Sequence, residues 1–259
     1  MKAKKVLIIC SSLVMCVLAF SGCHMQDPHN LKPDIQIKRD MTADLPVVYE
    51  IPDDANYYDV YAEVDYAFDS EISTLSAHAD AIVRGVVQEV VFTSYDGDAF
   101  TAVSLAVDEC YKGELEQGDL ITILHRGGYI PLQDHINRYT DGHMFESFSS
   151  EEIANTVLHE AYEGESDPQV GDYNIYFISS TNPNSGLPEQ AYQRVRGTVS
   201  LLRIEPDGKT VSRINPDMPR EEDPGDATPF SAENDAQPQP YGNEVFPLQE
   251  IVDIVSSDE

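Results

Sequence analysis

The sequence has no tryptophan, four cysteines and only 16 lysine and arginine residues among 259. Against these stand 46 aspartate and glutamate residues, which give a formal net charge of −30 at pH 7. A chain so acidic repels phosphate backbones and anionic lipid headgroups. The composition therefore argues against nucleic acid as a partner, and the length suits one large domain with appendages.

Three of the few basic residues, Lys2, Lys4 and Lys5, precede an apolar run from Val6 to Phe20. A basic start, an apolar run and then small residues predict an export signal over residues 1–22. The run is short for a permanent membrane-spanning helix, and a polar stretch with prolines follows it. We expect the signal to be cleaved.

The run ends in Phe20-Ser21-Gly22-Cys23, which resembles the lipobox of bacterial lipoproteins. The resemblance implies lipidation of Cys23, with Phe20 standing where that family usually has leucine. The expected location is the outer side of the cell membrane, with a lipid such as palmitate as the anchor. The alternative is an ordinary secretory signal that leaves Cys23 as a free thiol.

Cysteine usage excludes an intramolecular disulfide in the exported protein. Cys10 and Cys16 leave with the signal and Cys23 carries lipid, so only Cys110 remains. Cys110 ends the stretch AFTAVSLAVDEC, whose alternating apolar residues predict a half-buried strand. We therefore expect Cys110 to be a structural core residue rather than a nucleophile.

The rest of the chain reads as tether, domain, loop and helix. Residues 23–56 predict a solvated tether, residues 57–214 the folded domain, residues 215–244 an acidic, proline-rich disordered loop, and residues 245–259 a closing helix. In that helix Leu248, Ile251, Val252 and Val255 recur at helical spacing, so it is expected to dock on the domain. The role of segment 57–68 stays open between an added strand and an ordered lead-in.

Within the domain, turn residues separate short apolar stretches. We expect a helix at 70–79 capped by Ser70, a strand from Ala81 to Val91, a turn at 94–98, a partner strand to Cys110, and a third strand at 120–126. An excursion over 129–169 carries a predicted helix at 150–162, with a capping box of Ser149 and Glu152. A strand at 170–179 and a hairpin turning at Asp207-Gly208 follow.

These elements predict a mainly β (α+β) fold, a small OB-like antiparallel barrel of five or six strands with helices at its margins. The stretches SAHADAIVRGVVQEV, SLAVDECYKGELEQGDLITI and VGDYNIYFIS resemble the OB-like barrels of exported bacterial proteins, and more distantly the netrin-like, metalloproteinase-inhibitor domain. The resemblance covers roughly residues 75–205 and implies a fold rather than a function. A protease-inhibitor-like domain is the second alternative function that the resemblance offers. The inhibitors, however, use an amino-terminal cysteine with a free α-amine and a disulfide-bonded side chain, whereas Cys23 is expected to carry lipid.

Metal binding is the sharper alternative function. Four histidines, His125, His135, His143 and His159, fall within or beside the excursion, with Asp134, Asp141 and Glu160 near them, and zinc accepts such ligands. Their spacing matches no zinc motif, so a zinc-binding protein, with hydrolysis as its candidate activity, is an alternative that requires at least three of them to converge.

No nucleophile elbow, phosphate loop or isolated carboxylate pair occurs, so the sequence predicts no catalytic residue, no enzyme activity and no cofactor. The main hypothesis is an extracytoplasmic binding or interaction module for an unknown protein or small molecule. Its loops at 94–98, 127–148 and 180–194 would present contacts such as Tyr129, Tyr139, Phe145 and Tyr192.

Overall fold

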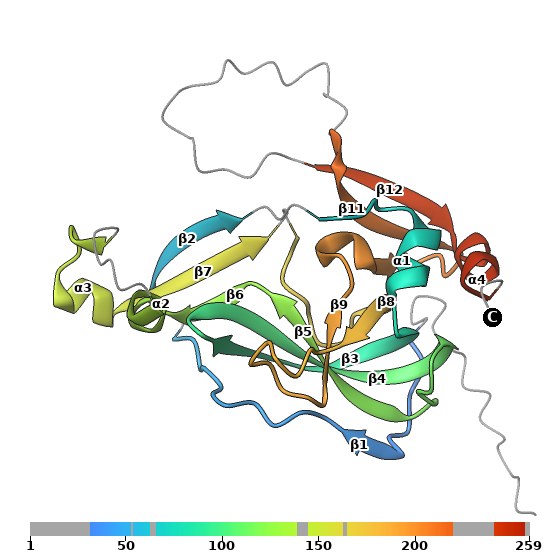
Figure 1. Cartoon of the computed structure of the whole chain (residues 1–259), viewed down its shortest axis with the longest axis horizontal. Helices are drawn as coiled ribbons and strands as arrows, with labels where there is room; N and C mark the ends of the chain where they lie inside the picture. The colour runs from blue at the N-terminus through green and yellow to red at the C-terminus, as the bar shows by residue number, and fades with distance from the viewer. Residues whose placement is uncertain are drawn as a thin grey trace, which may run out of the picture. The chain divides into compact units, whose positions relative to one another are not determined.

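The computed structural model describes residues 32–52, 54–62, 66–138, 145–162, 165–219 and 241–256, and the statements below concern these residues. They form twelve strands and four α-helices, a β-rich α+β fold (Figure 1). The predicted export signal, Cys23, Tyr139 and His143 lie outside the described residues. None of the described helices has the length and apolar character that crossing a membrane requires.

The strands of the large sheet are β1 (Arg39–Met41), β3 (Ala81–Tyr95), β4 (Asp98–Lys112), β5 (Asp119–Arg126), β8 (Tyr173–Ser180), β9 (Ala191–Arg194), β10 (Leu201–Ile204), β11 (Thr210–Pro219) and β12 (Tyr241–Pro247). The smaller sheet has β2 (Asn56–Ala62), β6 (Gly128–Pro131) and β7 (Thr156–Tyr162). The helices are α1 (Ile72–His78), α2 (Leu132–Arg138), α3 (Ser150–Ala154) and α4 (Leu248–Ser256), with a 3-10 turn at Gly197–Ser200.

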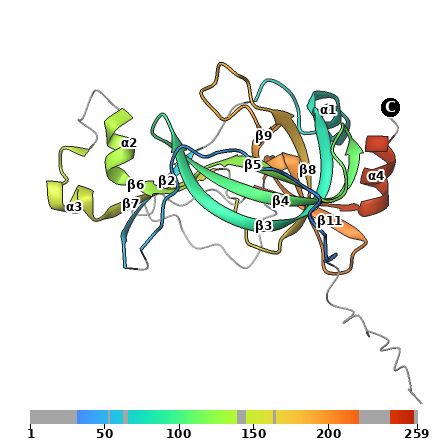
Figure 2. The same cartoon turned by 90° about the horizontal axis from the view of Figure 1, so that it is seen from below.

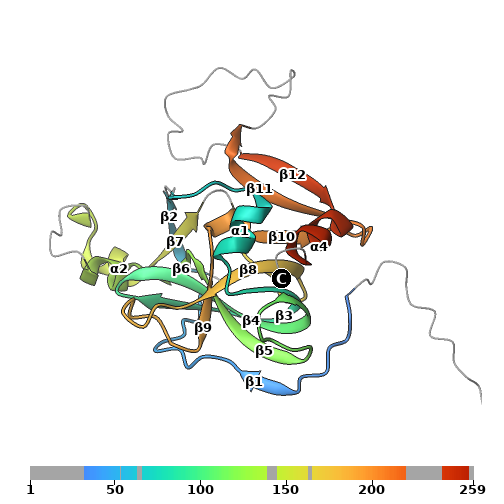
Figure 3. The ribbon, with the colours of Figure 1, turned by 45° about the vertical axis from the view of Figure 1, so that its right-hand side comes forward.

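Five strands of the large sheet pair in a closed cycle, which we call the five-strand ring. β3 pairs antiparallel with β4 and with β8, β4 pairs antiparallel with β5, β9 pairs antiparallel with β8, and β5 pairs parallel with β9. The predicted count of five or six strands is wrong, because β1 is added beside β5 and β10, β11 and β12 continue from β8 to make nine. Figure 3 shows β1 along β5 and the β11–β12 pair on the other side.

One apolar cluster is built from the ring strands themselves. Val83, Leu105, Ile123 and Tyr176 belong to it and have no exposed surface. Gly85 lets β3 and β4 approach, because a Cβ there would lie 2.4 Å from the carbonyl oxygen of Ala106. Since that oxygen is backbone and cannot move aside, an alanine at this position would disturb the pairing.

A second cluster holds the helices against the sheet. Ile251 and Val255 of α4 pack with Ile72 and Leu75 of α1 and with Phe177 of β8, all buried. Figure 1 shows the two helices side by side. The predicted docking of the closing helix is confirmed, although the helix begins at Leu248 because residues 241–247 form strand β12. The helix predicted at 70–79 is also present, with Glu71 rather than Ser70 at its N-cap.

The small sheet has the order β2-β7-β6, with β2 parallel and β6 antiparallel to β7. Helices α2 and α3 lie at its end (Figure 2). They cover one side of the sheet, where Ile130, Leu132, Leu158 and Phe145 form a buried cluster. Segment 57–68 therefore contributes a strand, β2, which answers the question that the sequence left open.

The prediction of a helix over 150–162 is wrong beyond the first turn. The capping box of Ser149 and Glu152 is present and starts α3, but the helix ends at Ala154 and residues 156–162 form strand β7. Asn155 ends the helix, and pairing with both β2 and β6 then satisfies the backbone of β7. Tertiary pairing has overridden a short helical pattern.

Two other predicted boundaries are corrected. The tether predicted over 23–56 is structured in its second half, because β1 pairs with β5, Arg39 forms an ion pair with Asp119, and the backbone N–H of Tyr49 donates to Phe92 at 2.9 Å. The loop predicted over 215–244 was drawn too long at both ends, because residues 215–219 belong to β11 and residues 241–244 to β12. Residues 220–240 lie outside the described residues.

Candidate functional site

Three residues from three strands form a row across the small sheet. The register places Asp59 of β2 beside His159 of β7, and His159 beside Tyr129 of β6. The imidazole of His159 lies flat on the phenol ring of Tyr129, with 4.2 Å between centroids and 5° between planes. Phe92 of β3 meets the same phenol ring edge-on at 4.9 Å, so the row is joined to the large sheet.

Two carboxylates flank the histidine ring. Asp59 Oδ1 lies 2.9 Å from His159 Nδ1, and Asp167 Oδ1 lies 3.9 Å from His159 Nε2. The hydroxyl of Tyr129 donates to Asp167 Oδ2 at 2.9 Å. Asp167 and Asp59 raise the pKa of His159 against the effect of burial, and His159 in turn lowers the pKa of Asp167. The pKa of Tyr129 is raised by burial and by Asp167, which keeps its hydroxyl protonated.

Two further tyrosines extend this row along β2. Side chains alternate along a strand, so Tyr57, Asp59 and Tyr61 share one face. Tyr57 is 49% and Tyr61 41% exposed, which is unusual for rings of this size. Tyr57 also meets the ring of Tyr129 edge-on at 5.9 Å. We call the surface of Tyr57, Asp59, Tyr61, Tyr129, His159 and Asp167 the tyrosine face.

The opposite side of β2 holds the strand in place. Tyr58 meets Phe145 and Phe148 edge-on at 6.1 and 5.7 Å, and Val60 packs against the cluster under α2 and α3. One side of β2 thus packs on the apolar cluster while the other leaves two rings in solvent. The tyrosine face is therefore fixed to a packed sheet rather than carried on a loop.

Three of the four histidines that the sequence proposed as metal ligands are described, and no shared metal site brings them together. His125, at the end of β5, is buried with its ring edge toward Tyr176, and its pKa is well below the ordinary value because of burial and Arg194. His135 of α2 is buried, with Nδ1 3.2 Å from the carbonyl of Gly97 and 3.3 Å from Glu160. His159 belongs to the tyrosine face.

His143 and Asp141, two other proposed ligands of the excursion, lie outside the described residues. Among the residues that the structure does describe, no group of three or more His, Cys, Asp or Glu side chains is placed to hold a metal ion. The convergence of three histidines that the zinc hypothesis required is therefore not found in this part of the chain.

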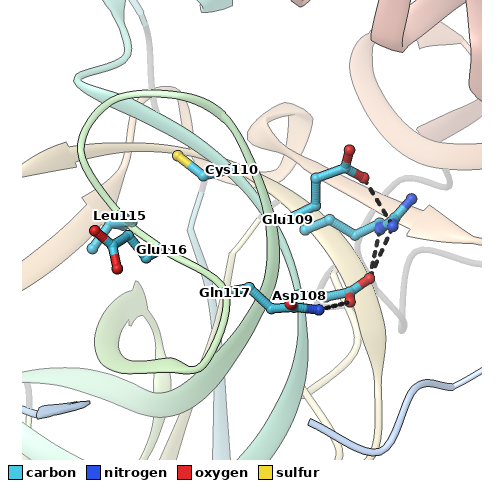
Figure 4. A pocket seen from close by; sticks show the side chains of 7 residues that line it. Asp108, Glu109, Cys110, Leu115, Glu116 and Gln117 are labelled. Atoms are coloured by element: carbon cyan, nitrogen blue, oxygen red, sulfur yellow. Dashed lines mark hydrogen bonds and ion pairs between the residues drawn. The ribbon is translucent and has the colours of Figure 1, made fainter. Parts of the chain in front are cut away.

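A separate open pocket of about 510 Å³ lies over the end of β4 and the turn before β5. Figure 4 shows Asp108 and Glu109 on one guanidinium, that of Arg84, which lies 2.9 Å from each carboxylate. Tyr173 donates to the same Asp108 oxygen at 2.5 Å. Asp108 is thus paired with Arg84 and Tyr173, as Asp59 and Asp167 are paired with His159 on the tyrosine face. What distinguishes the tyrosine face is its two exposed rings, Tyr57 and Tyr61.

The predicted contact residues are only partly brought together. Tyr129 lies on the tyrosine face, whereas Phe145 is buried on the opposite side of the sheet and Tyr192 of β9 packs against the apolar cluster of the ring. The prediction for Phe145 as a surface contact is wrong, since the cluster under α2 buries it. Tyr57, Asp59, Tyr61 and Asp167 were missed, although the alternation in NYYDVYA was a usable signal for the first three.

Comparison with known proteins adds no relative: no protein-family model and no curated protein sequence matches the chain.

Proposed function

We propose that this chain is a lipid-anchored extracytoplasmic binding protein whose tyrosine face takes up cationic groups. Export and anchoring rest on the basic start, the apolar run and Cys23. Binding rests on one observation, the two exposed rings of Tyr57 and Tyr61 on either side of Asp59. The proposal includes no catalytic step.

The domain that presents this face is, in our proposal, an OB-like barrel with added strands. The closed pairing of β3, β4, β5, β9 and β8 supports it, as does the parallel contact of β5 with β9 inside an otherwise antiparallel cycle. The apolar cluster built from these strands also supports it. Fold alone assigns no ligand, so the ligand class must come from the site.

The chemistry of the face favours a cation. The face of a phenol ring carries negative charge density, and two carboxylates stand beside the rings. When His159 is protonated, its imidazolium offsets only one of these two charges. The surrounding chain has a net charge of −30, which attracts cations over a longer range and repels anions. Ammonium and guanidinium groups fit this arrangement, and phosphate or sulfate groups do not.

The test is a titration of the purified full-length protein with tetramethylammonium and with lysine amide. The chain has no tryptophan, so tyrosine fluorescence and the proton resonances of the tyrosine rings report binding directly. Each exposed ring contributes about 0.5–1 kcal/mol to cation binding, so replacing Tyr57 and Tyr61 together by alanine should weaken binding about five- to thirtyfold. Val170→Ala, which removes an exposed apolar side chain elsewhere, is the matched control.

Binding that is equal in the double variant and in the control would reject the tyrosine face as the site. The anchor is tested separately by Cys23→Ser, which should move the protein from the membrane fraction to the soluble fraction because no second membrane signal replaces the lipid. Unchanged membrane retention would contradict the lipid anchor without bearing on the tyrosine face.

A further inference from the structure

Strand β2 forms an open edge of the small sheet. Among the described strands it pairs only with β7, and the ladder runs without a register shift from Asn56 opposite Thr156 to Ala62 opposite Tyr162. All seven residues of β2 are partly or largely exposed. An edge of this kind presents unpaired backbone N–H and C=O groups to its surroundings.

The register identifies which backbone groups are unpaired. The N–H of Asn56 donates to the carbonyl of Asn155 at 3.3 Å, so it points toward β7. Backbone groups alternate in direction along a strand, and those of Tyr57, Asp59 and Tyr61 therefore point away from β7. No described residue forms a backbone hydrogen bond with these outward groups. The same three residues carry the side chains of the tyrosine face.

This edge lacks most of the usual protection against strand addition, since Asp59 is the only charged residue of β2. Exposed edge strands are commonly guarded by lysine, by proline or by a bulge. The sequence of β2, NYYDVYA, has neither residue type, and its ladder has no bulge. It presents instead three tyrosines that are 38–49% exposed. An exposed sheet edge can accept an extended peptide through main-chain hydrogen bonds, and tyrosine is enriched among the residues that contribute most to binding.

From these observations we infer that the edge of β2 binds an extended segment of a basic partner, which adds a fourth strand to the small sheet. Alternate side chains of the partner, which are lysine or arginine, lie on the same side of the sheet as Tyr57, Asp59 and Tyr61. The cation opposite Asp59 then lies beside its carboxylate and between the two tyrosine rings. The spacing agrees, because alternate residues of both strands are about 6.5–7 Å apart. The inference rests on the proposed cation-binding function and names the partner class.

Charge decides between this partner and its competitors. A second copy of the chain also has a net charge of −30 and would place its own Asp59 at this edge, so the two copies would repel. The acidic segment 220–240 of this chain has Glu221, Glu222, Asp223 and Asp226 near its start, so Asp59 and Asp167 would repel it as well. A basic peptide is attracted by the same charges.

The experiment uses the full-length protein in detergent and three kinds of synthetic peptide, four peptides in all, of about seven residues, which matches the length of β2. The first alternates lysine and threonine, the second replaces lysine by glutamate, and the third keeps lysine but is N-methylated at every second backbone amide, in both possible registers. N-methylation removes the donors that face β2 and leaves the side-chain charges unchanged. We expect the lysine peptide to bind, the glutamate peptide not to bind, and one N-methylated register to bind at least about tenfold more weakly.

A pair of variants tests the same point from the protein side. Asp59→Asn removes the charge and keeps the outward N–H, whereas Asp59→Pro removes both and leaves the ladder with β7 intact, because the N–H of Asp59 is not used there. The lysine peptide should bind Asp59→Pro more weakly than Asp59→Asn, by about tenfold. Equal thermal melts of the two variants show that the sheet has survived both changes.

The outcomes separate the inference from the function on which it rests. If tetramethylammonium and lysine amide bind but both N-methylated peptides bind as well as their parent, strand addition is overturned and the cation site stands. If neither the small cations nor the lysine peptide bind, both are overturned. A dimer that is lost in Asp59→Pro but not in Asp59→Asn would show that a second copy occupies the edge, which also overturns the inference.

Discussion

The imidazole of His159 stacks on the phenol ring of Tyr129, 4.2 Å away and 5° from parallel, while Asp59 accepts from its Nδ1 at 2.9 Å. The three residues come from three different strands, so this contact exists only when the whole small sheet is formed. It links the stability of the sheet to the charge of one histidine. That link makes the stability dependent on pH.

The first prediction concerns this dependence. Asp167 and Asp59 raise the pKa of His159, so its stabilisation is fully present below the unfolded value of about 6.5 and is lost as the pH rises through the folded value. His159 lowers the pKa of Asp167. The stabilisation that Asp167 contributes is therefore present above its unfolded pKa of about 3.9 and is lost as the pH falls through its folded pKa. His159→Gln should therefore destabilise the protein more at about pH 5.5 than at about pH 9.

Urea unfolding of wild type and variant at the two pH values measures the effect. Because Asp59 is half exposed, the difference between the two pH values should not exceed about 1 kcal/mol. His78→Gln, which removes a stacked but exposed histidine of α1, is the control for the loss of an imidazole outside the small sheet. A loss in His159→Gln that is independent of pH would mean that stacking alone, and not charge, holds the row together.

The second prediction concerns a buried ion pair between β9 and the loop after β7. Arg194 Nη1 lies 2.6 Å from both carboxylate oxygens of Glu165, and both side chains are at least nine-tenths buried. Glu165→Gln leaves a buried guanidinium without its counter-charge and should cost about 3–5 kcal/mol of unfolding free energy. The double variant with Arg194→Met removes both charges and should recover a large part of that loss.

A double-mutant cycle by chemical denaturation checks this pair. If the double variant loses as much unfolding free energy as the two single variants lose together, the residues do not interact and the ion pair has no stabilising role.

The third prediction concerns Cys110, which the structure places on β4, half-buried against the apolar cluster of the ring, with Sγ 3.0 Å from the carbonyl of Lys112. Cys110→Ala should cost on the order of 1 kcal/mol through a small cavity, and Cys110→Val should cost less. Ser104→Ala on the same strand is the control. A bulky thiol reagent should label the native protein much more slowly than the unfolded protein, and equal rates would contradict the structural role.

Turn chemistry explains why this part of the chain was predictable. Gly113, Gly118 and Gly127 all have positive φ, as expected of residues that end strands in tight turns. The carboxylate of Asp119 accepts the N–H of Glu116 at 2.8 Å and pairs with Arg39, so the Gly-Asp pair shapes a turn rather than an active site. Such local signals need no knowledge of distant partners.

The small sheet could not be predicted in the same way. Ile153, Val157 and Ala161 have helical spacing, yet residues 156–162 become a strand because β2, about 100 positions earlier, pairs with them. The tyrosine face depends on that pairing, since Asp59 and His159 meet only in this register. A strand pairing over such a distance leaves no mark in a local sequence pattern. Four of the six residues of the tyrosine face were therefore missed, although the alternation in NYYDVYA was a signal for the three on β2.

The last prediction concerns α4, whose Ile251 and Val255 are 0% and 1% exposed against α1 and β8. Ile251→Ala leaves a cavity in this cluster and should cost about 2–5 kcal/mol, whereas Glu250→Ala on the exposed side should change stability by less than about 0.5 kcal/mol. Ending the chain after Gly242 removes α4 and most of β12 and should destabilise the protein further. Deleting half of residues 220–240 should change stability by less than about 1 kcal/mol, because loop-closure entropy depends only logarithmically on length. Thermal melts of these four variants and of the full-length protein measure the differences. If the truncated chain melts at the same temperature as the full-length protein, α4 does not stabilise the fold.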